Sequence, residues 1–241
     1  MLNSFVNNVK SIFVKDLVSE FRGRQTLPVM VMLGVLIAWI FRITAAEGAS
    51  DISVIAAAVL LVSLLFSAVL AAERGFAVEQ ENDCINALLL APVEAGDIYI
   101  AKLLVNVAML CISQVIAVPA AIVLFGVNVN NNWFYLIITL LLINIGMSSA
   151  AALLGCATEG TKVQNSLLSV LLMAALSPMM IPSVFALRVL FGDMNAEVVG
   201  SGVLAMVGNF KRAIGFLTAF DAIFVTLCWL LFDFVIGTQE K

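Results

Sequence analysis

Residues 52–72 read ISVIAAAVLLVSLLFSAVLAA, a run of 21 residues without a charged side chain. A helix of this length rises about 30 Å, which matches the hydrocarbon core of a bilayer. Of the 241 residues in the chain, 63% are hydrophobic and 12% are charged, about half the charged share of soluble domains. The run predicts a transmembrane helix, and the composition excludes a soluble enzyme, a disordered chain and a nucleic-acid-binding protein.

Five further apolar stretches lie on either side of this run, and each is close to the length of a membrane span. The sequence therefore predicts an all-α integral membrane protein with six transmembrane helices, at about 27–45, 52–72, 99–125, 133–157, 166–190 and 214–236.

Residues 1–26 have a helical pattern with an apolar face. Apolar side chains recur every four positions, and Lys, Arg, Asp and Glu fall between them. Such a helix is suited to lie in the interface between membrane and water. We therefore divide the chain into an interfacial amphipathic helix (1–26) and a six-helix transmembrane domain (27–241). The apolar positions are Phe5, Val9, Phe13, Leu17 and Phe21.

The Lys and Arg residues are distributed unevenly between the two sides of the predicted spans. With the N-terminus inside, eight of the 12 fall in inner segments and four in outer ones. Because cytoplasmic segments of membrane proteins are enriched in Lys and Arg, both termini are predicted to be cytoplasmic. The segment between the second and third spans is predicted to be cytoplasmic as well.

Two further patterns concern helix packing and the membrane boundary. Small residues at four-residue spacing let membrane helices approach closely, and they occur at Ser63, Ser67 and Ala71 and at Ser148, Ala152 and Cys156. Aromatic residues at the ends of spans favour the interface, which predicts interfacial positions for Tyr99, Trp133 and Tyr135.

The fifth predicted span contains Ser177-Pro178-Met179-Met180-Ile181-Pro182. Each proline removes a backbone donor, so the pair is expected to kink or break the helix. The freed carbonyls need polar neighbours or water, so this stretch is expected to face the protein interior or a substrate path. Met179 and Met180 are more consistent with packing than with haem ligation.

The last predicted span contains two acidic residues, Asp221 and Asp233. Acids within a membrane span raise the question of a transport or proton role. Each is also expected to lie near a helix end, where it can reach water or pair with a basic residue such as Arg212. The sequence therefore favours structural pairing over transport.

The segment that follows residues 52–72 is acidic. It holds Glu73, Glu79, Glu81 and Asp83 against a single basic residue, Arg74, and then becomes apolar again at 88–91. The cytoplasmic surface of a membrane is itself negative, so such a segment should face water or a basic protein. A docking helix for a soluble partner and a solvated loop without a special role are both compatible with this composition.

The block from 73 to 102 contains Glu73-Arg74, Phe76, Glu79, Glu81, Leu88-Leu89-Leu90-Ala91-Pro92-Val93, Ile98-Tyr99 and Lys102. Other distinctive residues are Lys15-Asp16-Leu17, Glu20, Arg22, Pro178, Pro182, Phe220-Asp221 and Phe232-Asp233-Phe234-Val235-Ile236. Together, over nearly the whole chain, they resemble the family of cytochrome c maturation protein B, also called haem exporter protein B. At 82–87 the chain departs from the family, which tends to have glycines and a smaller turn there.

The resemblance implies an ABC-2-type permease fold in the bacterial inner membrane. It implies a cytoplasmic ATPase subunit that binds ATP and docks on a coupling segment, 73–97, and other cytochrome c maturation membrane proteins as further partners. It also implies a second permease half, as a homodimer or a paired subunit. Haem is then the substrate rather than a bound cofactor, and no metal site is expected. The coupling residues implied are Glu73, Arg74, Phe76, Glu79, Glu81 and Asp83.

Three functions remain open from the sequence: haem delivery in c-type cytochrome biogenesis, export of a lipid, drug or polysaccharide by an ABC-2 permease, and a scaffold that transports nothing. None of them places catalysis on this chain. The string 155–162 resembles a phosphate-binding loop, but Val163 stands where Ser or Thr would bind magnesium. The chain has no His, so no imidazole is present to activate a nucleophile or ligate haem iron.

Overall fold

The computed structural model describes residues 2–23, 26–45, 52–81, 95–129, 132–158, 164–192 and 209–239. Helices account for nearly all of these residues, and these ranges contain no strand. The helices are α1 (Leu2–Gly23), α2 (Thr26–Ala45), α3 (Ile52–Glu81), α5 (Ala95–Phe125), α6 (Trp133–Thr158), α7 (Gln164–Phe191) and α9 (Phe210–Gln239).

Six of the helices, α2 to α9, are long and apolar enough to cross a membrane. They confirm the six predicted spans and the all-helical class. The main difference in bounds concerns α3, which continues past 72 as far as Glu81. The first part of the acidic segment is therefore a helical extension of the second span and not a separate short helix.

The helix α6 lies at the centre of the bundle, in contact with α3, α5, α7 and α9. Over an 18-residue apolar stretch of α6, 67% of the residues are buried, against 22% for α2 and 22% for α9. Lipid does not drive apolar helices together, so close packing depends on small side chains. The predicted small residues of α6 all lie in this interior: Ser148, Ala152 and Cys156 are buried.

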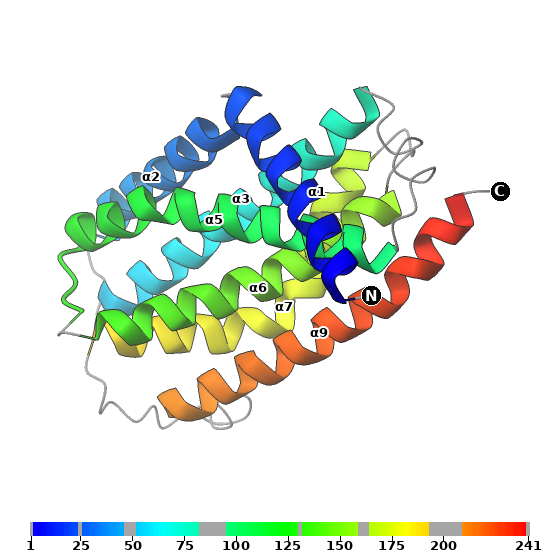
Figure 1. Cartoon of the computed structure of the whole chain (residues 1–241). Coiled ribbons are helices and arrows are strands. Elements are labelled where there is room, and N and C mark those ends of the chain that lie inside the picture. The colour runs from blue at the N-terminus through cyan, green and yellow to red at the C-terminus, as the bar shows by residue number, and fades with distance from the viewer. Residues whose placement is uncertain are drawn as a thin grey trace.

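The helix α1 runs across the direction of the spans and packs against α5 (Figure 1). Its buried side chains, Val9 and Ile12, belong to the cluster that contacts the start of α5. Phe13 and Leu17 are half-buried against the main core. Four apolar residues of α1 remain exposed: Val6, Val14, Val18 and Phe21. We call the end of the bundle where α1 meets α5 the α1 end. The start of α1 and the end of α9 both lie at this end.

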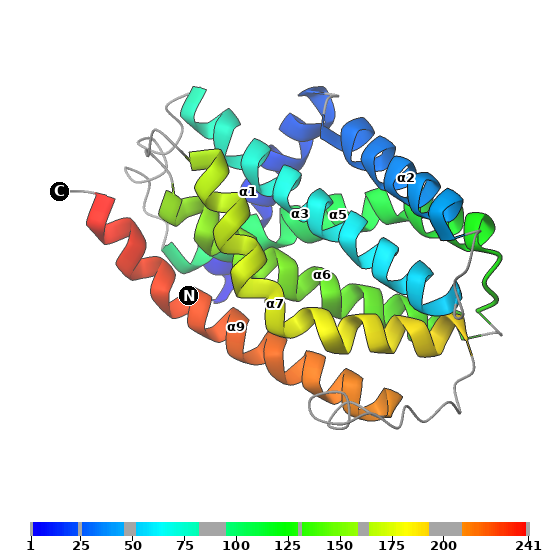
Figure 2. The ribbon, with the colours of Figure 1, turned by 180° about the vertical axis from the view of Figure 1, so that it is seen from behind.

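The helix α7 contains both Pro178 and Pro182, yet it is continuous from Gln164 to Phe191. The predicted break is therefore absent, and the predicted kink is present: α7 bends midway along its length (Figure 2). The hydroxyl of Ser177 donates to the carbonyl of Ala174 at 2.9 Å. In a regular helix this carbonyl would accept from the N–H of residue 178, which proline lacks. The side chain next to the proline therefore compensates for the lost backbone bond.

Two adjacent leucines of α7 provide a test of this packing. Leu172 is fully buried, whereas Leu171 is 43% exposed. Leu172→Ala should destabilise the protein by about 2 kcal/mol or more, because the removed side-chain atoms leave a cavity and their van der Waals contacts are lost. Leu171→Ala is the matched control and should change stability by less than about 0.5 kcal/mol. Thermal unfolding of the detergent-solubilised protein measures both, and equal effects would contradict the assigned face of α7.

Candidate functional site

The first turn of α5 is a buried polar site at the α1 end. Asp97 is only 3% exposed, and its Oδ2 accepts a hydrogen bond from Asn8 Nδ2 of α1 at 3.1 Å. A carboxylate in the first turn also faces the positive end of the helix dipole. The neighbouring Gly96 leaves room for the indole of Trp229 on α9, because a Cβ there would collide with Nε1. The start of α5 is thus held by α1 and α9 together.

One turn further along α5, Lys102 forms a second contact with α1. It is buried, and its Nζ lies 3.7 Å from Oδ2 of Asp16. The other carboxylate oxygen of Asp16, Oδ1, lies 3.3 Å from the Nζ of Lys15. The Lys102 and Asp16 side chains are 8% and 12% exposed, so the pair is shielded from water. A charge pair of this kind loses most when one partner alone is removed.

The end of α3 is tied to α7 at the same end of the bundle. Ser169 Oγ of α7 donates to Oε1 of Glu73 at 2.8 Å. Glu73 begins the acidic extension of α3, and Asp97 lies just inside α5. Both helices that flank residues 82–94 are therefore anchored by buried or half-buried carboxylates, one to α7 and the other to α1.

The predicted coupling residues are only partly described. Glu73 has the contact with Ser169. Four others lie on the helical extension of α3, but their side chains are outside the described part of the structure: Arg74, Phe76, Glu79 and Glu81. Asp83 lies outside the described residues altogether.

The predicted kink residues lie at the bend of α7. Met179 is 1% exposed and belongs to the main core, and Met180 packs against that core. Pro182 is buried, whereas Pro178 is exposed. Only one of the two prolines therefore faces the protein interior.

The prediction of a paired Asp221 near a helix end is wrong. Asp221 is the central residue of the span Phe210–Phe232, it is 6% exposed, and neither carboxyl oxygen has a hydrogen-bond partner. The suggested partner Arg212 is exposed, more than two turns away on the same helix. The other acid, Asp233, is on α9, and its side chain is outside the described part.

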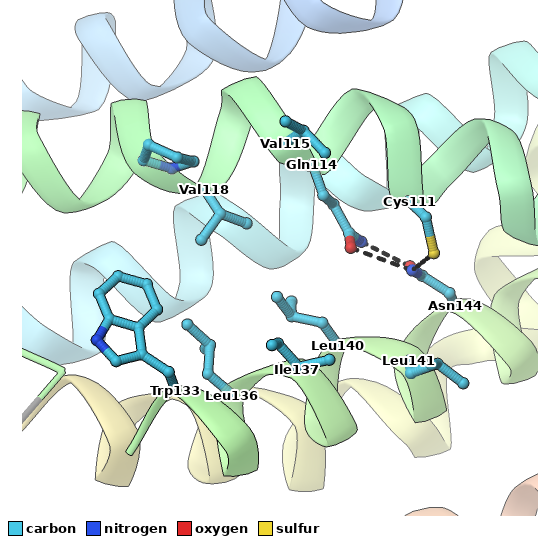
Figure 3. Close-up of a pocket in the computed structure, with 11 residues that line it drawn as sticks. Cys111, Gln114, Val115, Val118, Trp133, Leu136, Ile137, Leu140, Leu141 and Asn144 are labelled. Carbon is cyan, nitrogen blue, oxygen red and sulfur yellow. Dashed lines mark hydrogen bonds between the residues drawn. The ribbon is translucent and has the colours of Figure 1, made fainter. Parts of the chain in front are cut away.

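The sequence reading missed a polar pair between α5 and α6. Gln114 Nε2 donates to Asn144 Oδ1 at 2.6 Å, and Asn144 Nδ2 donates to Gln114 Oε1 at 3.1 Å and to Cys111 Sγ at 3.4 Å. The pair borders a largely apolar pocket of about 320 Å³ between the two helices, with Trp133 at its other end (Figure 3). Amide side chains inside otherwise apolar spans were the signal that could have revealed it.

Tyr99 also differs from its predicted place. It is fully buried, and its ring lies 5.4 Å from that of Phe232 on α9. By contrast Trp133 and Tyr135 are exposed, as interfacial aromatics would be. A position near a span end thus does not decide whether an aromatic residue faces lipid or a neighbouring helix.

The family model described as CcmB protein matches residues 7–228, which includes most of α1 and extends to Cys228 in α9. No curated protein matches the chain.

The ion pair between α1 and α5 can be tested by mutation. Lys102→Ala should destabilise the protein by about 2 kcal/mol, less than for a fully unpaired buried charge because Lys15 still faces Asp16. Lys10→Ala is the control, since Lys10 is exposed on the same helix as Asp16, and it should be nearly neutral. Thermal unfolding gives the size of the effect. Limited trypsin digestion should release α1 faster in the Lys102 variant alone, and unchanged digestion would refute the anchoring role.

Proposed function

The chain belongs to the CcmB family, and we propose that it is the membrane permease subunit of an ABC transporter complex that delivers haem for c-type cytochrome biogenesis. The observation that supports this proposal is the family match over residues 7–228. The six apolar helices are consistent with a permease. Haem is here the substrate of the complex and is not held by this chain through imidazole, because the chain has no His.

A separate cytoplasmic ATPase subunit would dock on residues 73–97 and hydrolyse ATP for the complex. The extension of α3 supports this placement, because it continues the second span as a helix that carries Glu73, Glu79 and Glu81. A rigid helix transmits a push at its tip to the membrane span, which a flexible loop would not do. The remaining partners proposed are a second permease half and other cytochrome c maturation membrane proteins.

Force applied to this segment would reach two parts of the bundle. Through Glu73 it would act on Ser169 and hence on α7, the bent helix. Through Asp97 and Lys102 it would act on α1, whose exposed apolar side chains suit it to the membrane surface. The α1 end would then be the cytoplasmic end, in line with the excess of Lys and Arg in the segments predicted to be inside.

Depletion of the protein tests the haem assignment. In a cell with no second copy, covalent haem stain of membrane and periplasmic proteins should be lost, while b-type haem stays at its normal level. This result would link the protein to attachment of haem rather than to haem synthesis. Unchanged covalent haem would refute the assignment and favour a permease for another substrate.

Charge reversal tests the coupling segment. Glu79→Lys combined with Glu81→Lys should release the ATPase subunit from membranes, since two acidic docking residues become basic. The matched control is Glu47→Lys with Asp51→Lys, the same reversal in the segment that precedes α3. Fractionation followed by quantification of the ATPase measures the effect. Equal retention in both variants would refute docking on α3 and leave the haem assignment intact.

A further inference from the structure

Three helices meet at their midpoints in the interior of the bundle. Asp221 is the central residue of the span Phe210–Phe232, Met179 is central in Leu167–Phe191, and Gly146 is one residue from the centre of Trp133–Ala157. The three residues lie close together. A Cβ at Gly146 would lie 2.5 Å from Asp221 Oδ1 and 2.6 Å from Met179 Sδ. The carboxyl group of α9 therefore occupies space that only a glycine on α6 leaves open.

The bend of α7 brings Met179 to this point. The two prolines flank the contact, and the hydroxyls of Ser177 and Ser183 donate to carbonyls of the same helix, Ala174 and Met179, at 2.9 Å and 2.7 Å. On α6, Ser149 likewise donates to the carbonyl of Gly146 at 2.9 Å. These three hydroxyl groups are therefore engaged with backbone, and Asp221 has no hydrogen-bond partner for either oxygen.

The elements packed against α9 offer Asp221 no counter-charge in the described structure. α6 has no Asp, Glu, Lys or Arg, and its titratable groups are Tyr135 and Cys156. α7 has only Arg188, nine residues beyond Met179 and about 13 Å along the helix. The charged groups of α5, Asp97 and Lys102, lie at the α1 end, where Tyr99 packs with Phe232 and Cys228 of α9.

An ionised carboxylate in such a place has lost its hydration and gained no donor, which is strongly unfavourable near the middle of a bilayer. The neutral acid avoids most of this cost. We propose that Asp221 is a proton-binding switch, which holds a proton while α9 packs against α6 and α7 and releases it to entering water when α9 separates from the bend of α7. This inference goes beyond haem delivery and does not depend on it.

Infrared spectroscopy tests the bound proton directly. At neutral pH the protein in lipid should show the carbonyl stretch of a protonated carboxyl group, and Asp221→Asn should remove it. Asp97→Asn is the matched control, because Asp97 is also buried but accepts a hydrogen bond from Asn8, and it should leave the band in place. A wild-type spectrum without the band, or a band unaffected by Asp221→Asn, would overturn the proposal.

Thiol labelling tests the separation of α9. Cys228 lies two turns from Asp221 on the same helix and is 3% exposed. Its maleimide labelling is followed by peptide mass spectrometry between about pH 6 and pH 9, in wild type and in Asp221→Asn. The variant has no carboxyl group to titrate at this position. Dividing the wild-type rate by the variant rate at each pH therefore cancels the pH dependence of the thiol itself. The ratio should rise several-fold with pH, and a constant ratio would overturn the switch.

A second variant without a titratable group keeps the test possible if the first one disturbs the packing. If Asp221→Asn fails to fold, Asp221→Leu removes the titratable group without a polar one in its place. Both measurements are then repeated with that variant. Neither uses haem or the ATPase subunit, so failure of the switch and failure of the proposed function are separate results.

Discussion

The need to satisfy every backbone hydrogen bond without water governs this structure. In the described part of the chain the response is an all-helical bundle, in which hydroxyl side chains repeatedly donate to carbonyls of their own helix. The clearest case is α7, where Ser177 bonds to the carbonyl that Pro178 leaves without a donor. The helix can then bend without breaking, and the bend places Met179 in the core.

Close contact between the helices comes from small and polar groups rather than from the hydrophobic effect. Gly34 of α2 approaches Ser63 of α3 and Ala117 of α5, with 3.7 Å from the position of a Cβ to each neighbouring Cβ. The amide pair of Gln114 and Asn144 joins α5 to α6 in the same interior. These contacts belong to the buried part of α6: no residue from 142 to 156 is exposed, whereas Trp133 and Ile137 near its start are exposed.

The polar groups fall into two layers with different consequences. At the α1 end, carboxylates are paired, and these pairs tie α3 to α7 and α5 to α1. At mid-span, Asp221 has no hydrogen-bond partner. Carboxylates with a hydrogen-bond or ion-pair partner hold helices in one arrangement, whereas a buried acid without a partner makes an arrangement depend on its proton. The first layer suits transmission of force from a partner, and the second suits a change of state within the bundle.

The number and approximate bounds of the spans, the amphipathic first helix and the family could all be predicted from the sequence alone, because hydropathy over about 20 residues and a long block of distinctive residues are local properties. The sequence also located the kink of α7. Tertiary structure decided which neighbours each side chain meets: Tyr99 packs inside instead of at the interface, Gln114 pairs with Asn144, and Asp221 faces Gly146 and Met179 instead of Arg212. These contacts join residues far apart in the chain, and spacing along one helix does not specify what the next helix presents to it.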